Sequence, residues 1–94
     1  MTIDKYISIG EIIELVIQQE PTRQDIILGL SNCVGGQWRG RAYYQFVDST
    51  NANQIGAKWQ FVDCLVVEHP KKGTIIIDKL KDKRIGGIEF YNLI

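Results

Sequence analysis

The spacing of the apolar residues changes once along this chain, close to Trp38. Before that point apolar residues recur every three or four positions, which is the period of an amphipathic helix. After it they tend to alternate with polar residues, which is the period of a strand, and aromatic and β-branched residues become frequent. A single change of this kind predicts helices first and a sheet second, and therefore an α+β fold.

The first predicted helix covers residues 9–19. Its apolar residues fall at helical spacing and form one stripe, and they are Ile9, Ile12, Ile13, Val16 and Ile17. Ser8 followed by Glu11 has the form of a capping box, in which each side chain satisfies a backbone group at the helix start. Pro21 ends the helix because its ring cannot continue the hydrogen-bond ladder.

A second, shorter helix is predicted over residues 23–31. Thr22 and Asp25 repeat the capping pattern, and apolar residues follow at helical spacing. Gly29 weakens the pattern because glycine lowers helix stability by about 1 kcal/mol relative to alanine. A strand over residues 26–30 is the alternative that the sequence leaves open.

Four strands are predicted in the rest of the chain, at residues 38–48, 58–68, 74–80 and 84–92. Residues 58–68 carry apolar side chains on both faces, which predicts a central strand. Short polar turns separate the last three strands. The predicted architecture is one domain, residues 1–94, with two N-terminal helices packed on one face of a four-stranded antiparallel meander.

Composition limits the environment in which the protein works. The 94 residues include 11 basic and 11 acidic side chains, so no net charge draws the whole molecule to nucleic acid or to a membrane. No signal peptide and no run of eighteen apolar residues is visible. Cys33 and Cys64 lie too far apart in sequence for a metal-binding pair, and we expect both to be reduced. These features predict a cytoplasmic protein.

The last hairpin carries a resemblance to a known family. Residues 73–78 read Gly-Thr-Ile-Ile-Ile-Asp, and residues 81–92 contain the run Gly87, Ile88, Glu89 before Phe90. Together with the strand at residues 42–48, this resembles a family of short prokaryotic domains that end in a Gly-Ile-Glu hairpin strand. The resemblance covers residues 41–92. It implies a small β-rich unit without assigned catalytic residues, and for some members an accessory role in toxin–antitoxin-like pairs.

No arrangement of residues in the sequence favours catalysis. Cys64 and His69 are the one cysteine–histidine pair close in sequence, but they are predicted to lie in a strand and in the turn beyond it. Asp63 lies within an apolar strand, where an edge or bulge position is the simpler interpretation. We therefore expect no enzyme activity, no cofactor, no metal ion and no small-molecule substrate.

The favoured functional hypothesis is protein binding, as a homo-oligomer or as an accessory subunit of the antitoxin-like or immunity-like kind. Two short helices cannot cover both faces of the predicted sheet, so aromatic surface is expected to remain for a partner. The residues predicted to form this interface are Arg41, Tyr43, Trp59, Phe90 and Tyr91.

Nucleic-acid binding is the alternative hypothesis. Residues 1–35 hold two basic and five acidic side chains, whereas residues 36–94 hold nine and six. Several of the basic side chains cluster in the two turns that flank the third predicted strand, and they are Lys71, Lys72, Lys81, Lys83 and Arg84. Such a cluster could contact a phosphate backbone, although lysines in turns also keep loops solvated and sheet edges apart.

Overall fold

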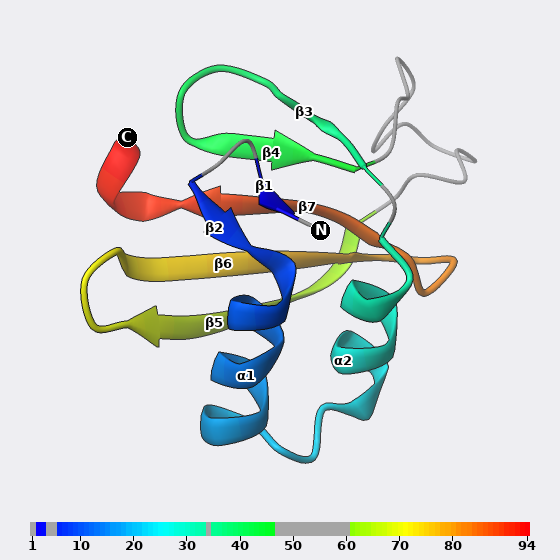
Figure 1. The fold of residues 1–94 in the computed structure, drawn as a ribbon. Coiled ribbons are helices and arrows are strands. Elements are labelled where there is room, and N and C mark those ends of the chain that lie inside the picture. Colours follow the sequence, from blue (N-terminus) through cyan, green and yellow to red (C-terminus); the bar gives the residue numbers. More distant parts are fainter. Residues whose placement is uncertain (1, 4–5, 34, 47–60) are drawn as a thin grey trace.

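The computed structural model of the chain describes residues 2–3, 6–33, 35–46 and 61–94 (Figure 1). These residues form two α-helices followed by an antiparallel sheet, which confirms the predicted α+β fold. A small hairpin of β1 (Thr2–Ile3) and β2 (Ile7–Ser8) precedes the first helix and was not predicted.

The first helix, α1 (Ile9–Gln19), has the bounds that the sequence predicts. Ser8 caps it, because its Oγ accepts a hydrogen bond of 3.0 Å from the backbone N–H of Glu11. The Glu11 carboxylate makes a contact outside the helix, with His69. The buried side of α1 includes Leu15, which the predicted stripe omitted, while Ile17 is exposed.

The second helix, α2 (Gln24–Ser31), forms where the sequence left a strand open as the alternative. Its buried residues are Ile26 and Leu30. Gly29 lies where the helix meets the sheet, and a Cβ added there would come within 2.9 Å of Cγ1 of Ile85. The glycine therefore lets the helix pack closely on the sheet, and the stabilisation from this packing outweighs the low helix propensity of glycine.

Within the described residues the main sheet has five strands, one more than predicted. They are β3 (Gln37–Trp38), β4 (Tyr43–Gln45), β5 (Phe61–His69), β6 (Gly73–Leu80) and β7 (Ile85–Phe90), in the spatial order β3-β4-β7-β6-β5. The predicted strand 38–48 is, over its described residues 38–46, two short strands, because the chain turns at Gly40, whose φ is +80°, and residues 47–48 fall outside the described parts. Its second part, β4, pairs with β7 and not with β5, so the predicted meander order holds only for β5, β6 and β7.

Two predicted strand positions also need correction. Residues 58–68 were predicted to form a central strand, but β5 lies at an edge of the sheet; residues 58–60 fall outside the described parts. The last strand ends at Phe90, two residues earlier than predicted, and a 3₁₀ helix, η1 (Tyr91–Leu93), follows it.

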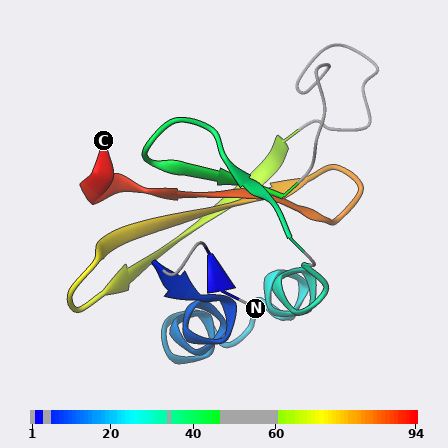
Figure 2. The same cartoon turned by 45° about the horizontal axis from the view of Figure 1, so that its top comes forward.

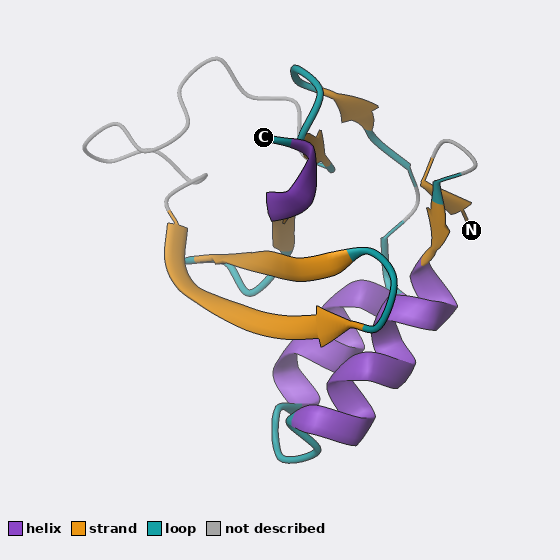
Figure 3. Cartoon of the chain, turned by 90° about the vertical axis from the view of Figure 1, so that its left-hand side faces the viewer, coloured by secondary structure: helices purple, strands orange, loops and turns teal. Residues whose placement is uncertain are grey.

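The core lies between the two helices and one face of the sheet (Figure 2). The sheet contributes alternate residues to it, which are Tyr44, Leu65, Val67, Ile75, Ile77, Ile88 and Phe90. Phe90 also packs against the ring of Tyr6, with the ring centroids 5.0 Å apart. Figure 3 shows both helices on this one side of the sheet, where α1 contacts β5 and α2 contacts β7. On the opposite face, here called the outer face, the described residues place neither α1 nor α2. Neither α1 nor α2 is long and apolar enough to cross a bilayer, and the described residues contain no other helix that is.

Candidate interaction surface on strand β5

The outer face of β5 exposes a row of apolar side chains. Leu65 and Val67 point into the core, so strand alternation places Cys64 and Val66 on the outer face. Val62 is 61% exposed, Val66 is 49% exposed, and Cys64 is an exposed free thiol. We call Val62, Cys64 and Val66 the β5 strip. Exposed apolar residues in a row are typical of surfaces that contact another molecule.

Gln19 shows which backbone groups of β5 point away from the sheet. Its Nε2 donates a hydrogen bond of 2.7 Å to the carbonyl oxygen of Glu68, and its Oε1 accepts one of 2.8 Å from the Glu68 N–H. Both backbone groups of Glu68 therefore point away from β6. Because these directions alternate along a strand, the N–H and C=O groups of Cys64 and Val66 also point away from β6.

The free edge of β5 is closed at both ends and open between them. At one end the Gln19 side chain forms hydrogen bonds with both backbone groups of Glu68, as the backbone of a neighbouring strand would. At the other end the pairing of β5 with β6 shifts by one residue between Phe61 and Asp63, which is a β-bulge. Within the described residues no hydrogen bond reaches the outward backbone groups of Cys64 and Val66. We call residues 64–66 the open window.

An ion-pair network fixes the start of α2 next to the open window. Arg23 bonds Asp63 of β5 through Nη2 at 2.6 Å and Asp25 through Nε at 3.2 Å. Lys79 of β6 bonds Asp25 at 2.8 Å. The hydrogen bonds from Arg23 and Lys79 hold the pKa of Asp25 well below its ordinary value. Asp63 therefore has a structural role at the bulge and stays partly exposed, as the simpler interpretation of its position predicted.

Over β4 and β7, the side chain of Tyr43 covers part of the outer face. The Tyr43 hydroxyl donates a hydrogen bond of 3.1 Å to Oδ2 of Asp78, and its ring lies over Gly87, where a Cβ would overlap the ring. Burial is the main cause that raises the pKa of Tyr43. Burial also raises the pKa of Asp78, with a smaller contribution from Glu89, although the bond from Tyr43 lowers it. Among the described residues, Tyr43 therefore covers the closed half of the outer face, around Gly87, whereas the β5 strip is exposed.

We expect Asp78→Asn to stabilise the fold at pH 7 and to have little effect at pH 3. Because its pKa is raised by folding, Asp78 contributes stability that is complete below its ordinary value of 3.8 and is lost as the pH rises through the raised value. Asparagine can still accept the bond from Tyr43 and carries no charge to desolvate. Urea unfolding at the two pH values measures the difference. An equal change in midpoint at both pH values would contradict the raised pKa.

His69 is an anchor for the turn that follows β5. Its Nδ1 accepts hydrogen bonds of 3.0 Å from the backbone N–H groups of Lys71 and Lys72. The proton is therefore on Nε2, which donates to the Glu11 carboxylate. Both ring nitrogens have hydrogen-bond partners, and none of these partners is Cys64. The hypothetical cysteine–histidine pair is not formed.

The predicted interface residues are divided among three settings. Arg41 and Tyr91 are exposed, and the 2.7 Å bond from the Phe90 N–H to the carbonyl of Ala42 brings them to the same end of the sheet. Tyr43 is half-buried and bonded to Asp78. Phe90 is completely buried, so its placement at a surface is corrected: it belongs to the core of its own chain. Trp59 lies outside the described residues.

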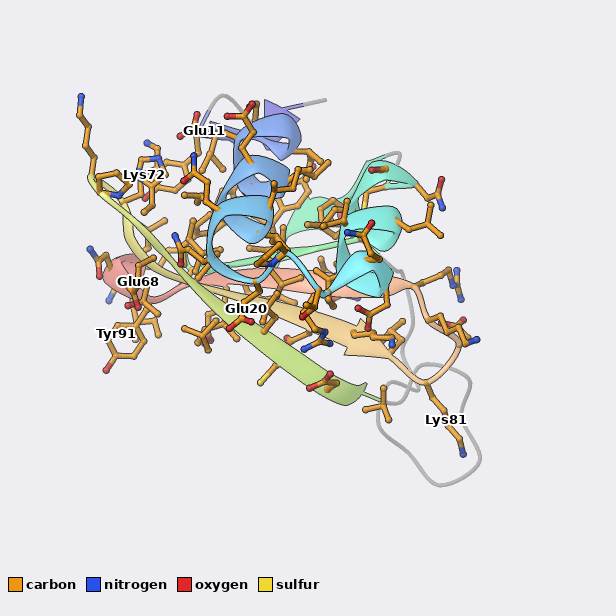
Figure 4. The ribbon with its side chains drawn as sticks, turned by 90° about the horizontal axis from the view of Figure 1, so that it is seen from below. Glu11, Glu20, Glu68, Lys72, Lys81 and Tyr91 are labelled. Atoms are coloured by element: carbon orange, nitrogen blue, oxygen red, sulfur yellow. The ribbon has the colours of Figure 1, made fainter. Side chains whose placement is uncertain are left out.

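The predicted basic residues do not form one patch. Lys71 and Lys72 lie in the turn before β6, whereas the other three, Lys81, Lys83 and Arg84, lie in the turn after it. Strand β6 has eight residues, which at about 3.3 Å each separate the two turns by about 25 Å. Figure 4 shows Lys72 and Lys81 at opposite ends of the molecule. The Lys72 ammonium lies 4.1 Å from the centre of the Tyr6 ring, and Arg84 bonds Asp82 at 2.7 Å.

A cavity of about 180 Å³ lies between the end of α2 and the turn after β6. Its lining residues are Gly29, Asn32, Cys33, Gly35, Phe46, Lys83, Arg84 and Ile85. Burial raises the pKa of Cys33 to about 11, and its Sγ donates to the carbonyl of Gly29 at 3.4 Å. The thiol is therefore protonated at neutral pH and unsuited to nucleophilic attack.

The described parts of the chain contain no group of three or more His, Cys, Asp or Glu side chains that could hold a metal ion.

Sequence reasoning missed the open window for a physical reason. The apolar residues of β5 on both faces are a visible signal, and they predict a strand covered on both sides. The long-range contact of Gln19 with Glu68, which closes one end of the edge, has no signature in the sequence.

Comparison with protein-family models, with curated proteins and with solved structures found no match to this chain.

Proposed function

We propose that this protein acts by binding a protein chain through the β5 strip and the open window, as a homo-oligomer or as an accessory subunit of the antitoxin-like or immunity-like kind. One observation carries the proposal: β5 has the two-sided apolar composition of a central strand but lies at the edge of the sheet. A partner strand placed beside β5 would supply the missing neighbour for both its backbone and its side chains.

Natural proteins usually protect their edge strands against pairing with other chains. Here Gln19 and the bulge protect the two ends of β5, and the protection stops at residues 64–66. An edge left open between two protected ends favours selective pairing with a short extended segment over unlimited aggregation.

Approximate energies indicate an interaction of moderate strength. Four backbone hydrogen bonds at the open window would each contribute about 0.5–1.5 kcal/mol. Covering the exposed parts of Val62 and Val66 would add on the order of 2 kcal/mol. Association itself costs at least about 4 kcal/mol, so stable binding also needs contacts around the window.

A photo-crosslinking amino acid at position 66 tests this proposal in cells of the protein's own source. The matched control carries the same amino acid at position 28, because Leu28 is also an exposed apolar residue but lies on α2. We expect a protease-sensitive, nuclease-resistant adduct from position 66 and none from position 28. A nuclease-sensitive adduct, or equal adducts from both positions, would contradict the proposal.

Nucleic-acid binding has weaker support as an alternative, because the two basic turns lie at opposite ends of β6 and two of their cations already have partners.

A cytoplasmic location is part of the proposal. It is supported by the two cysteines, which are both free thiols and of which Cys64 is exposed. An exposed unpaired thiol is typical of a reducing compartment.

A further inference from the structure

We infer that the chain that fills the open window is a second copy of this protein, paired with β5 in antiparallel register about Leu65. This inference rests on the proposed function and specifies its partner. It follows from the positions of the two features that close the edge. The Gln19-capped residue, Glu68, lies three residues after Leu65, and the bulge residue, Val62, lies three residues before it.

A two-fold axis at Leu65 uses every free backbone group of the window. Cys64 of each copy lies opposite Val66 of the other, and each such pair exchanges two N–H···O=C hydrogen bonds. The two pairs together make four bonds. No outward N–H or C=O of residues 64 and 66 is then left without a partner, and no group that Gln19 already occupies is needed.

The same axis makes the ends of the two strands compatible. It places the capped Glu68 of one copy opposite Val62 of the other. A bulge interrupts the regular ladder, so the pairing needs no hydrogen bonds from Val62 to the Glu68 groups that Gln19 already bonds. The two Glu68 carboxylates lie at opposite ends of the paired strands, about 20 Å apart, where they repel each other little.

Other antiparallel registers fit less well. A shift of two residues in one direction would pair the backbone of Glu68, which Gln19 already occupies. A shift of two residues in the other direction would require regular pairing at Val62, inside the bulge. On the outer face, the register at Leu65 brings the two β5 strips side by side into one apolar patch of six side chains, which are Val62, Cys64 and Val66 of each copy.

Disulfide formation between two different variants tests both the partner and the register. In the proposed pairing, residue 64 of one copy and residue 66 of the other have Cα atoms about 5.5 Å apart, which suits a disulfide. Equivalent residues of the two copies, such as Cys64 and Cys64, are diagonal neighbours about 7–8 Å apart and too distant. A chain with Cys64→Ser and Val66→Cys is therefore mixed with wild type under mild oxidation.

We expect a covalent dimer in the mixture and none from either protein alone. The matched control replaces Val62 with cysteine in the Cys64→Ser chain, and it should give no covalent dimer with wild type because residue 62 faces residue 68. A dimer from wild type alone, or equal yields from the control mixture, would overturn the register. No covalent dimer in any mixture would overturn the inference.

Val66→Pro supplies a second readout, the dissociation constant of the dimer. Proline removes an N–H that points away from β6, a position where edge strands tolerate it. Two bonds are lost per dimer, and we expect the Kd measured by sedimentation to rise at least about tenfold, with an unchanged circular dichroism spectrum. Val66→Thr keeps the N–H and is the matched control. The disulfide test does not depend on the folding of this variant.

The two proposals fail in distinguishable ways. If the purified protein is monomeric, forms no covalent dimer, and position 66 crosslinks a protein of different mass in cells, the second copy is overturned and the proposed function stands. If position 66 crosslinks no protein in cells and the purified protein forms no dimer, both proposals are overturned.

Discussion

Replacing Phe90 with alanine is expected to lower the free energy of unfolding by about 3–5 kcal/mol. Phe90 has no exposed surface, and its ring packs edge-on against Tyr6 and lies 5.7 Å from the ring of Trp38, centre to centre. Truncation would leave a cavity beside the rings of Tyr6 and Trp38. Because small domains have total stabilities of roughly 5–15 kcal/mol, this one change removes a large part of the whole.

The adjacent residue provides the matched control for Phe90. Tyr91 is 59% exposed at the start of η1, so Tyr91→Ala is expected to change stability by no more than about 0.5 kcal/mol. Urea unfolding followed by circular dichroism measures both variants. Similar losses for the two would contradict the burial of Phe90, and a loss of partner binding in Phe90→Ala would reflect unfolding and not a lost contact.

The second large effect is expected at Gly87. An alanine Cβ at this position would overlap the ring of Tyr43, so the ring must move and its hydroxyl must leave Asp78. We expect Gly87→Ala to lower stability by about 1–3 kcal/mol. Gly10→Ala is the control, because a Cβ there meets nothing closer than 4.0 Å and alanine favours the helix by roughly 0.5–1 kcal/mol.

A double-mutant cycle shows whether the overlap with Tyr43 is the cause. In a Tyr43→Ala background the ring is absent, and Gly87→Ala should then lower stability by much less than it does in the wild type. If Gly87→Ala is equally destabilising in both backgrounds, the ring does not lie over Gly87 and the closed half of the outer face is described wrongly.

The helices could be predicted because their determinants are local. Residues 9–19 form α1 as expected, since the cap at Ser8, the apolar spacing and the stop at Pro21 all act within a few residues. The turn at Gly40 is local too, but a glycine in a strand pattern also fits a bulge, so the division into β3 and β4 was missed.

The order of the strands depends on contacts that local patterns do not encode. Strand β4 pairs with β7, more than forty residues later, because Tyr44 and Ile88 share the core face and Tyr43 covers Gly87 on the other. The alternation of apolar residues predicts that such strands exist, but it does not identify their neighbours.

The candidate site was predictable only in its chemical character. Exposed apolar surface was expected, and four of the five residues chosen for it were aromatic. The structure instead buries Phe90 and bonds Tyr43 to Asp78, and it leaves a valine and cysteine row exposed on β5. Whether an apolar strand is covered on both faces depends on its place in the sheet, and here that place follows from the pairing of β4 with β7.

Amide hydrogen exchange along β5, measured at several protein concentrations, tests the central claim most directly. In dilute solution the amides of Leu65 and Val67, which face β6, should be protected, and those of Cys64 and Val66 should exchange rapidly. As the concentration rises, Cys64 and Val66 should become protected while the Glu68 amide, held by Gln19, does not change. Protection of Cys64 and Val66 that is already complete in dilute monomer would contradict an open window on this edge.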